Sequence, residues 1–477
     1  MVDASPRPTS LTAEPGSFRD WDGRVFSAGE RVARALSEAG LANWQALVET
    51  ELLATYTAAG ELVATEPAGD DLLRELRALD PAGAWAGALV HERLPFVSYP
   101  YEWSFAMLRD AAQLQLRLLS AALREGLTLK DATPYNVQWR GARPVFIDIG
   151  SFQRGTKDEP WAGYRQFCML FLYPLMLEAY RGVAFQPWLR GSIDGIAPTD
   201  FRALFTRRDL LRRGMARHVF LHASLERRYA DTTAGMKDDL REAGFDARVV
   251  AATVSSLSKL VSRLNVSGTT SAWSGYQSSC SYEEQEIAAK EDFVRRIAGA
   301  KARRLVWDLG CNDGRYSRIA SGHADFVVAV DSDRAVVDAL YAALQAEGSE
   351  KILPLVIDLA DPSPAIGWAN AERTTLVQRG RPDLVLCLAL VHHLSITRNV
   401  PLREVVAWLS SLECEVVIEF PHRSDPMVQR LLSAKREGAH PDYARETFED
   451  ALRSRFAVAE TVGLASGTRT LYHAVPR

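Results

Sequence analysis

The C-terminal part of the chain alternates short apolar segments with longer amphipathic ones. Apolar runs of strand length predict buried parallel strands, and the segments between them predict helices. Two further segments, 455–464 and 468–476, predict a terminal antiparallel pair. This alternation predicts a doubly wound α/β sheet with ligands at the carboxyl ends of its strands. We place the parallel strands near residues 304–309, 326–331, 352–357, 383–389 and 414–420.

The N-terminal part of the chain has a mixed pattern that predicts an α+β domain with a helical extension. Residues 31–56 show helix-like spacing, and residues 61–66 read as a short strand. Apolar positions recur at helical spacing over 104–126, which predicts a long amphipathic helix. Residues 161–265 are mostly helical in pattern. Their most apolar run, 167–177, is far shorter than the ~20 residues that span a bilayer, so it predicts a buried helix interrupted by a proline.

A segment rich in serine, glycine and threonine, residues 265–282, separates the two parts. Its composition is typical of a linker. It also carries Trp273, Tyr276 and Tyr282, which are unusual in a flexible tether. The rings either pack between domains or fold over a ligand of the following domain as a lid, and both interpretations stay open.

Composition narrows the class of protein. A length of 477 residues predicts two or three domains. The net charge of −4 and a pI near 6.2 give no reason to expect a nucleic-acid partner. The five cysteines are scattered without a C-x-x-C pair, which favours reduced thiols in the cytoplasm over disulfides or zinc. The polar N-terminus has no apolar core of the kind found in signal peptides, so we expect neither export nor membrane attachment.

The first candidate site is the turn DLGCNDG, which follows an apolar strand and precedes a helix. Its glycines, Gly310 and Gly314, allow backbone N–H groups to approach a ligand closely. Asp308 opens the turn, and Asp331 ends the next strand, 23 residues later. An acid at that distance is placed to accept hydrogen bonds from a ribose. A Rossmann domain for a nicotinamide cofactor is the alternative, although the turn lacks the pattern G-x-G-x-x-G.

These motifs resemble those of the class I S-adenosylmethionine-dependent methyltransferases, over roughly residues 281–477. The chain most resembles their two-part, nodulation-protein-like bacterial members. The resemblance implies that Asp331 binds the ribose. Asn312 stands where the family has the middle glycine, and asparagine tolerates a left-handed backbone. The resemblance implies S-adenosyl-L-methionine as cofactor, bound by Asp308, Gly310, Asn312, Gly314, Asp331, Asp358 and Leu359 (in VIDLADP), Ala389 (in RPDLVLCLALVHHL) and Tyr282.

Methyl transfer is an in-line displacement for which the protein mainly supplies alignment and a dry pocket. A hydroxyl acceptor also has to lose a proton. The candidates for this role are His392 and His393 after the fourth strand, and Glu419 and His422 after the fifth. A neutral histidine suits such a base near pH 7. The side chains of His392, Glu419 and His422 also have metal-binding chemistry, but we assign no metal.

A second motif, LKDATPYN followed by PVFIDIG, resembles the catalytic loop and metal-binding strand end of protein kinases and aminoglycoside-type phosphotransferases. The resemblance assigns Asp131 as the base and Asn136 and Asp148 as metal ligands. No glycine-rich loop precedes the motif, and Lys130 is the first lysine of the chain, so the usual phosphate-binding lysine is missing. Active phosphotransfer, a pseudokinase-like substrate module and an unrelated hairpin with turn-capping side chains all stay open.

We therefore predict a cytoplasmic biosynthetic enzyme in two parts. Residues 283–477 form the methyltransferase domain, which we expect to O-methylate a small-molecule or sugar-containing acceptor. The kinase-like domain spans 1–200, with a helical extension over 201–264, and binds or positions the substrate. A bifunctional phosphotransferase–methyltransferase is one alternative. A non-catalytic protein-interaction scaffold in the N-terminal half is another.

Overall fold

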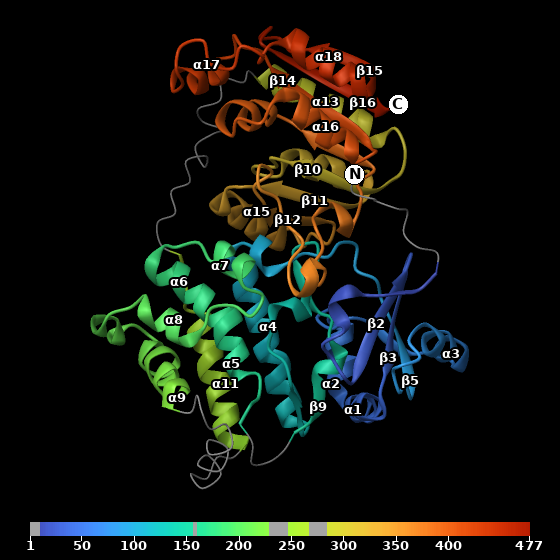
Figure 1. Ribbon diagram of the computed structural model, residues 1–477, viewed down its shortest axis with the longest axis vertical. Coiled ribbons are helices and arrows are strands. Elements are labelled where there is room, and N and C mark those ends of the chain that lie inside the picture. The colour runs from blue at the N-terminus through green and yellow to red at the C-terminus, as the bar shows by residue number, and fades with distance from the viewer. Residues whose placement is uncertain (1–9, 156–159, 229–246, 267–283) are drawn as a thin grey trace. The chain divides into compact units, whose positions relative to one another are not determined.

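A computed structural model describes residues 10–155, 160–228, 247–266 and 284–477 (Figure 1). The chain divides into two compact units. The first comprises Met1–Trp139, Pro144–Gly268 and Ala365–Arg373, and the second comprises Arg140–Arg143, Thr269–Pro364 and Thr374–Arg477. Among the helices that the structure describes, none combines the length and hydrophobicity that spanning a bilayer requires. The predicted linker, with its three aromatic residues, lies almost wholly outside the described residues.

The first unit begins with a five-stranded antiparallel sheet in the order β1-β2-β3-β5-β4. Its buried face carries apolar side chains such as Phe26 and Ala33, which belong to one core cluster with Trp85 and with Leu76 of helix α3 (Asp70–Leu79). The strands are β1 (Thr12–Ala13), β2 (Gly23–Ala28), β3 (Arg31–Leu36), β4 (Thr65–Pro67) and β5 (Gly87–His91).

The helix predicted over 31–56 is wrong in its first part. Arg31–Leu36 forms β3, which pairs with β2 on one side and β5 on the other. Helix α1 (Glu38–Val48) starts only after Ser37, whose side chain accepts a hydrogen bond from the backbone N–H of Gly40. Such a cap fixes the helix start. Helix α2 (Glu51–Ala58) follows, and the strand predicted over 61–66 is shorter and later, as β4.

The long helix predicted over 104–126 is confirmed as α4 (Phe105–Arg124), which is buried along most of its length. Strand β6 (Leu127–Leu129) pairs antiparallel with β9 (Phe152–Arg154). Between them lies the predicted hairpin, formed by β7 (Val137–Arg140) and β8 (Arg143–Phe146). This arrangement brings the loop after β6 and the end of β8 into one neighbourhood.

The remainder of the first unit is helical, as predicted. Pro174 does not end its apolar helical segment, because the backbone stays helical from α5 (Tyr164–Phe167) through a π-helical stretch, Cys168–Leu172, into α6 (Tyr173–Arg181). The π-helical stretch directly before Pro174 replaces the regular α-helical hydrogen bonding there. The other helices are α7 (Gln186–Gly191), α8 (Pro198–Ala203), α9 (His222–Arg228) and α11 (Ala247–Val261).

The second unit is built on a seven-stranded sheet in the order β12-β11-β10-β13-β14-β16-β15. Its first five strands run parallel, and β16 is antiparallel to both neighbours. This is the Rossmann-like sheet that the sequence predicts. The strands are β10 (Arg303–Leu309), β11 (Ala324–Asp331), β12 (Ile352–Val356), β13 (Leu384–Cys387), β14 (Glu415–Pro421), β15 (Phe456–Gly463) and β16 (Arg469–Pro476).

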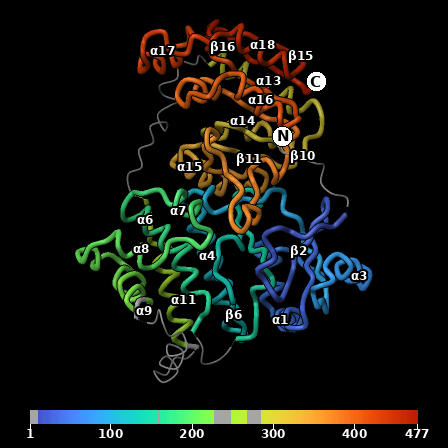
Figure 2. Tube along the Cα trace, in the orientation of Figure 1, coloured from blue at the N-terminus to red at the C-terminus, as the bar shows by residue number. Residues whose placement is uncertain are grey.

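Strand order reverses at β10, which pairs with β11 on one side and β13 on the other. Figure 2 labels β10 and β11 within the second unit. The carboxyl ends of strands at such a switch point form the crevice in which open α/β sheets bind ligands. The helices are α13 (Glu284–Gly299), α14 (Arg315–Ser321), α15 (Arg334–Ala346), α16 (Leu402–Ser411), α17 (Pro426–Ser433) and α18 (Arg445–Arg455).

Candidate active site

The turn after β10 has the backbone that a close ligand approach requires. Gly310, Asn312 and Gly314 all have positive φ angles, of 77°, 47° and 75°. Asparagine therefore adopts the left-handed conformation expected of it in place of the family's middle glycine. The backbone N–H groups of Gly310 and Cys311 both donate to the carbonyl of Val330, at 2.8 and 2.9 Å. These bonds attach the turn to the neighbouring strand β11.

The carboxylate of Asp331 is held in place by the backbone. One oxygen accepts from the N–H of Asn312 at 3.1 Å, and the other accepts from the N–H of Asp333 at 2.9 Å. Burial raises the pKa of Asp331, although these hydrogen bonds act in the opposite direction. An oriented, partly buried carboxylate at this strand end suits the two hydroxyls of a ribose.

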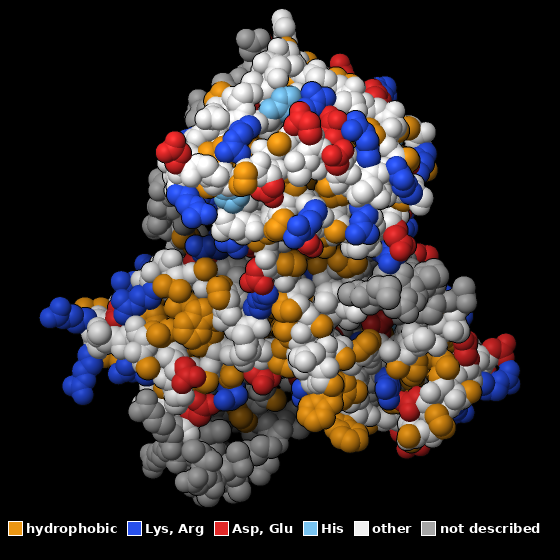
Figure 3. All heavy atoms as spheres, turned by 45° about the horizontal axis from the view of Figure 1, so that its top comes forward, with side chains coloured by type: hydrophobic (Ala, Val, Ile, Leu, Met, Phe, Trp, Pro, Cys, Tyr) orange, Lys and Arg blue, Asp and Glu red, His pale blue; other side chains and the backbone are white. Residues whose placement is uncertain are grey.

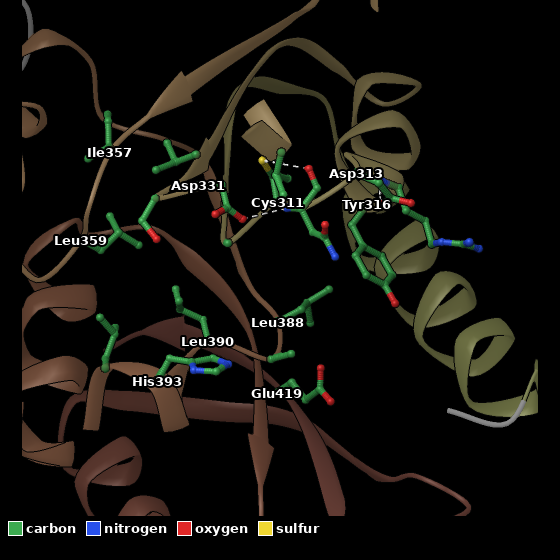
Figure 4. Close-up of a pocket in the computed structure, with 18 of the residues that line it drawn as sticks. Cys311, Asp313, Tyr316, Asp331, Ile357, Leu359, Leu388, Leu390, His393 and Glu419 are labelled. Carbon is green, nitrogen blue, oxygen red and sulfur yellow. Dashed lines mark hydrogen bonds between the residues drawn. The ribbon is translucent and has the colours of Figure 1, made fainter. Parts of the chain in front are cut away.

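A cavity of about 530 Å³ opens at the carboxyl ends of these strands (Figure 4). The turn, the end of β11 and the loops after β12 and β13 all contribute to its wall. Apolar side chains such as Ile357 and Leu388 alternate there with acids, which fits a nucleoside with a charged tail. The predicted residues that line it are Gly310, Asn312, Asp331, Asp358, Leu359, Ala389, His393 and Glu419.

Two of the predicted cofactor-binding residues, Asp308 and Gly314, do not line the cavity. Asp308 is almost fully buried and accepts a hydrogen bond from the Ser317 hydroxyl at 2.5 Å. Burial raises the pKa of Asp308 to about 7. Gly314 is the residue before α14, where an added Cβ would come within 2.6 Å of Leu340. Both residues shape the turn. Tyr282 lies outside the described residues.

At one side of the cavity, Asp358 forms an ion pair with Arg398. Its other oxygen accepts from the backbone N–H of Ala360 at 2.9 Å. Arg398 also lines the cavity, and it is not among the residues that the sequence predicts there. The acid expected to meet an adenine therefore already has a cationic partner from the segment after β13.

The four predicted catalytic residues occupy different surroundings. His393 and Glu419 line the cavity, and Figure 4 shows both directed toward the space below Tyr316. Burial lowers the pKa of His393 to about 4, so its imidazole is neutral at pH 7. His392 is fully buried, is not part of the cavity wall, and neither ring nitrogen has a hydrogen-bond partner among the described residues. His422 shares a hydrogen bond with Thr470 at 2.8 Å, also away from the wall.

Glu419 belongs to a buried group of charges that sequence reasoning missed. Lys290 of α13 donates to its carboxylate at 2.7 Å, and Arg469 of β16 donates to the same oxygen at 2.9 Å. Burial alone would raise the pKa of Glu419, but these two cations outweigh it and lower the pKa. The available signal was the position of Lys290, because it shares an apolar helical stripe with Ile287, Val294 and Ile297.

In the first unit, the structure brings Asn136 and Asp148 together. The Asn136 amide donates to one oxygen of Asp148 at 3.2 Å, and Arg34 of β3 contacts the other at 2.8 Å. Burial raises the pKa of Asp131, and the negative charge of Asp148 adds to that shift. Lys130 contacts Asp20 at 3.0 Å. The sequence predicted no strand cation here, and Arg34 supplies one.

The acidic and metal-ligating side chains bear on metal binding, and the surface charges bear on nucleic-acid binding. Over the described residues, no group of three or more His, Cys, Asp or Glu side chains is arranged to hold a metal ion. On the face that Figure 3 shows, basic and acidic side chains are interspersed and do not form a single basic patch. Such mixing is typical of an ordinary solvated surface.

No protein-family model matches the chain. The chain is similar to the nodulation protein NoeA of Rhizobium meliloti (strain 1021). The two are 34% identical over 474 residues, which cover 99% of this chain and 97% of that protein.

Two solved methyltransferases are similar to part of the chain. One is the N-methyltransferase NodS from Bradyrhizobium japonicum WM9 in complex with S-adenosyl-L-homocysteine. It is 13% identical, with a TM-score of 0.30, over 40% of this chain and 87% of that one. The other is magnesium protoporphyrin IX methyltransferase from Synechocystis PCC 6803 with the same ligand. It is 18% identical, with a TM-score of 0.29, over 40% of this chain and 83% of that one. Likenesses at these TM-scores support no functional conclusion by themselves.

Proposed function

The chain belongs to the family of the nodulation protein NoeA. We propose that residues 283–477 of this chain catalyse methyl transfer from S-adenosylmethionine. One observation carries the proposal: the left-handed turn after β10 and the carboxylate of Asp331 face the same cavity at the switch point of the sheet. The left-handed turn lets a ligand approach the backbone closely, Asp331 offers a ribose partner, and Ile357 and Leu359 offer an apolar wall for a purine.

When bound, the cofactor would supply the methyl group on a sulfonium leaving group. Gly310, Asn312 and Asp331 would hold its nucleoside and tail, and Asp358 and Leu359 would meet its base. The protein's part in the reaction is then to align the acceptor and exclude water. Lys290, Tyr316, His393 and Glu419 also line the cavity and offer polar groups to an acceptor.

We propose that the acceptor is a hydroxyl group of a small-molecule or sugar-containing metabolite. The nodulation name of the relative supports a metabolite acceptor only by analogy. The neutral imidazole of His393 can accept a hydrogen bond from a hydroxyl. Four buried, free cysteines among the described residues support a reducing, cytoplasmic setting.

The test compares untargeted metabolite profiles of a strain that carries the gene with one that lacks it. We expect a product heavier than its precursor by one CH₂ group, which the purified chain forms from that precursor and S-adenosylmethionine. Label transfer from the methyl group of the cofactor to the precursor's hydroxyl oxygen would support O-methylation. Transfer to a nitrogen or carbon would contradict the hydroxyl acceptor but would still support methyltransferase activity.

For the N-terminal half, we propose a kinase-like domain over residues 1–200, extended by helices over 201–264, that binds the acceptor without transferring phosphate. The engagement of Asp148 supports this proposal, because Arg34 and Asn136 already occupy both of its oxygens. A metal ion would have to displace the guanidinium. Asp20, placed beside Lys130, adds a negative charge that would repel phosphates.

The rival for this half is a phosphotransferase, which would make the chain bifunctional. Arg34 favours it in one respect, because it gives β3 a cation of the kind that kinase-like sites use to hold phosphates. A non-catalytic protein-interaction scaffold is the third candidate. Calorimetry with the full chain separates them: Mg-ATP binding supports the phosphotransferase, and binding of the methyl acceptor without Mg-ATP binding supports our proposal. Binding of neither leaves the scaffold.

A further inference from the structure

An ammonium group and a carboxylate meet on the cavity wall, both removed from water. The side chains of Lys290 and Glu419 are 3% and 0% exposed, and their closest N–O distance is 2.7 Å. Both residues line the cavity. Lys290 comes from α13, which precedes the glycine-rich turn, and Glu419 comes from β14. A lysine in such a place can take part in chemistry only if it can lose its proton.

Arg469 makes that loss electrostatically feasible. It donates to the same Glu419 oxygen that Lys290 contacts, and it also contacts Asp425 at 2.6 Å. An arginine side chain does not deprotonate in proteins. Glu419 therefore keeps a cationic partner, which it shares with Asp425, when Lys290 becomes neutral, and a neutral amine can still donate one N–H to the carboxylate.

We propose that Lys290 is the base of the methyl-transfer reaction, and that it loses its own proton when the positively charged cofactor binds beside it. The inference rests on the proposed function. A sulfonium in a cavity of low dielectric disfavours a second positive charge nearby. Loading the cofactor would thus generate the free amine that the acceptor needs.

The proton balance of the step is complete. The acceptor's lone pair forms a bond to the methyl carbon, and the carbon–sulfur bond breaks with its electrons remaining on sulfur. The acceptor's proton passes to the Nζ atom of Lys290. The neutral thioether product no longer opposes an ammonium, so Lys290 keeps this proton until the product leaves.

The surroundings of Lys290 support a titratable amine. Burial lowers its pKa, and Arg469 lowers it further, whereas Glu419 and Glu286 act in the opposite direction. The other candidates are poorer bases. Glu419 stays ionised because two cations lower its pKa, and the pKa of His393 is about 4. The hydroxyl of Tyr316 stays protonated because burial raises its pKa.

The test needs no acceptor. The full chain is titrated with S-adenosylmethionine and, separately, with S-adenosylhomocysteine, in buffers of different ionisation enthalpy at one pH. We expect the charged cofactor to release up to one proton per site and the neutral product to release none. We also expect the affinity ratio of the two ligands to change in favour of S-adenosylmethionine as the pH rises from about 6 to 9.

Two variants and one control identify the residue that releases the proton when the cofactor binds. Lys290→Met and Lys290→Arg should both abolish the proton release, and Lys290→Arg keeps a positive charge next to Glu419. Lys301→Met, which removes an exposed lysine paired with Glu415, should behave as wild type. Proton release that persists in Lys290→Arg would overturn the inference. So would an equal loss of affinity for both ligands in Lys290→Met, which indicates an anchor for the ligand's carboxylate. Failure of the wild type to bind either ligand would instead contradict the proposed function.

Discussion

The backbone N–H of Asn312 donates a hydrogen bond to the carboxylate of Asp331 at 3.1 Å. This bond joins the turn after β10 to the end of β11, the two strand ends at the switch point of the sheet. It fixes the direction of the carboxylate before any ligand arrives, and such preorganisation lowers the entropic cost of binding. Asn312 makes the bond from a left-handed backbone, which explains how the turn survives without the family's middle glycine.

Gly310→Ala should cost about 1–2 kcal/mol of unfolding free energy, because the position has a φ of 77° that a residue with a Cβ adopts poorly. Strain is the reason and crowding is not, since the nearest protein atom to an added Cβ is Leu390 Cδ1 at 3.5 Å. Urea unfolding measures the loss. Gly463→Ala is the matched control, because it has open space and no positive φ. Equal stability of the Gly310 variant and the wild type would contradict this account of the turn.

Asp308→Asn should remove a pH dependence of stability. The pKa of Asp308 rises from 3.8 to about 7 in the folded protein. Between those values the folded state keeps a proton that the unfolded state loses, so stability falls with rising pH, by at most about 1.4 kcal/mol per unit. The amide of the variant does not titrate. The measured quantity is therefore the difference in unfolding free energy between wild type and variant, followed from about pH 4 to about pH 8. A constant difference would show that Asp308 is already ionised in the folded protein.

Asp148→Asn should destabilise the first unit by about 1–3 kcal/mol, because, among the described residues, it removes the closer of two carboxylates that face the guanidinium of Arg34, whose side chain is 9% exposed, and leaves only Asp20 at 3.9 Å. Asp71→Asn, at an exposed pair with Arg74, should change stability by less than about 0.5 kcal/mol. Thermal unfolding compares the two. The same proteins are incubated with labelled ATP, Mg²⁺ and the acceptor, and we expect no label transfer by any of them. Transfer by the wild type that Asp148→Asn abolishes would establish the phosphotransferase.

The sequence predicts the second unit well because its strands are fully buried. Continuous apolar runs such as 326–330 leave little choice of structure, and the turn that follows β10 is local. The residues that prediction missed depend on distant contacts. Glu419 was among the predicted residues, but its partner Lys290 was not, because the two are 129 residues apart and only the folded domain brings them together. The spacing of apolar residues predicts helix for strand β3, because the pairing with β2 and β5 that decides its conformation cannot be seen in its own sequence.

The most direct test of the central claim is a calorimetric titration with S-adenosylhomocysteine of the wild-type chain and of the Asp331→Ala variant. We expect binding of one ligand per chain, weakened by ~1.5–3 kcal/mol in the variant, since a charge-assisted hydrogen bond to the ribose is lost. Asp325→Ala, at the exposed opposite end of the same strand, should bind as wild type does. A folded Asp331→Ala variant with undiminished affinity, or a wild type that binds no ligand, would contradict the assignment of this cavity to the cofactor.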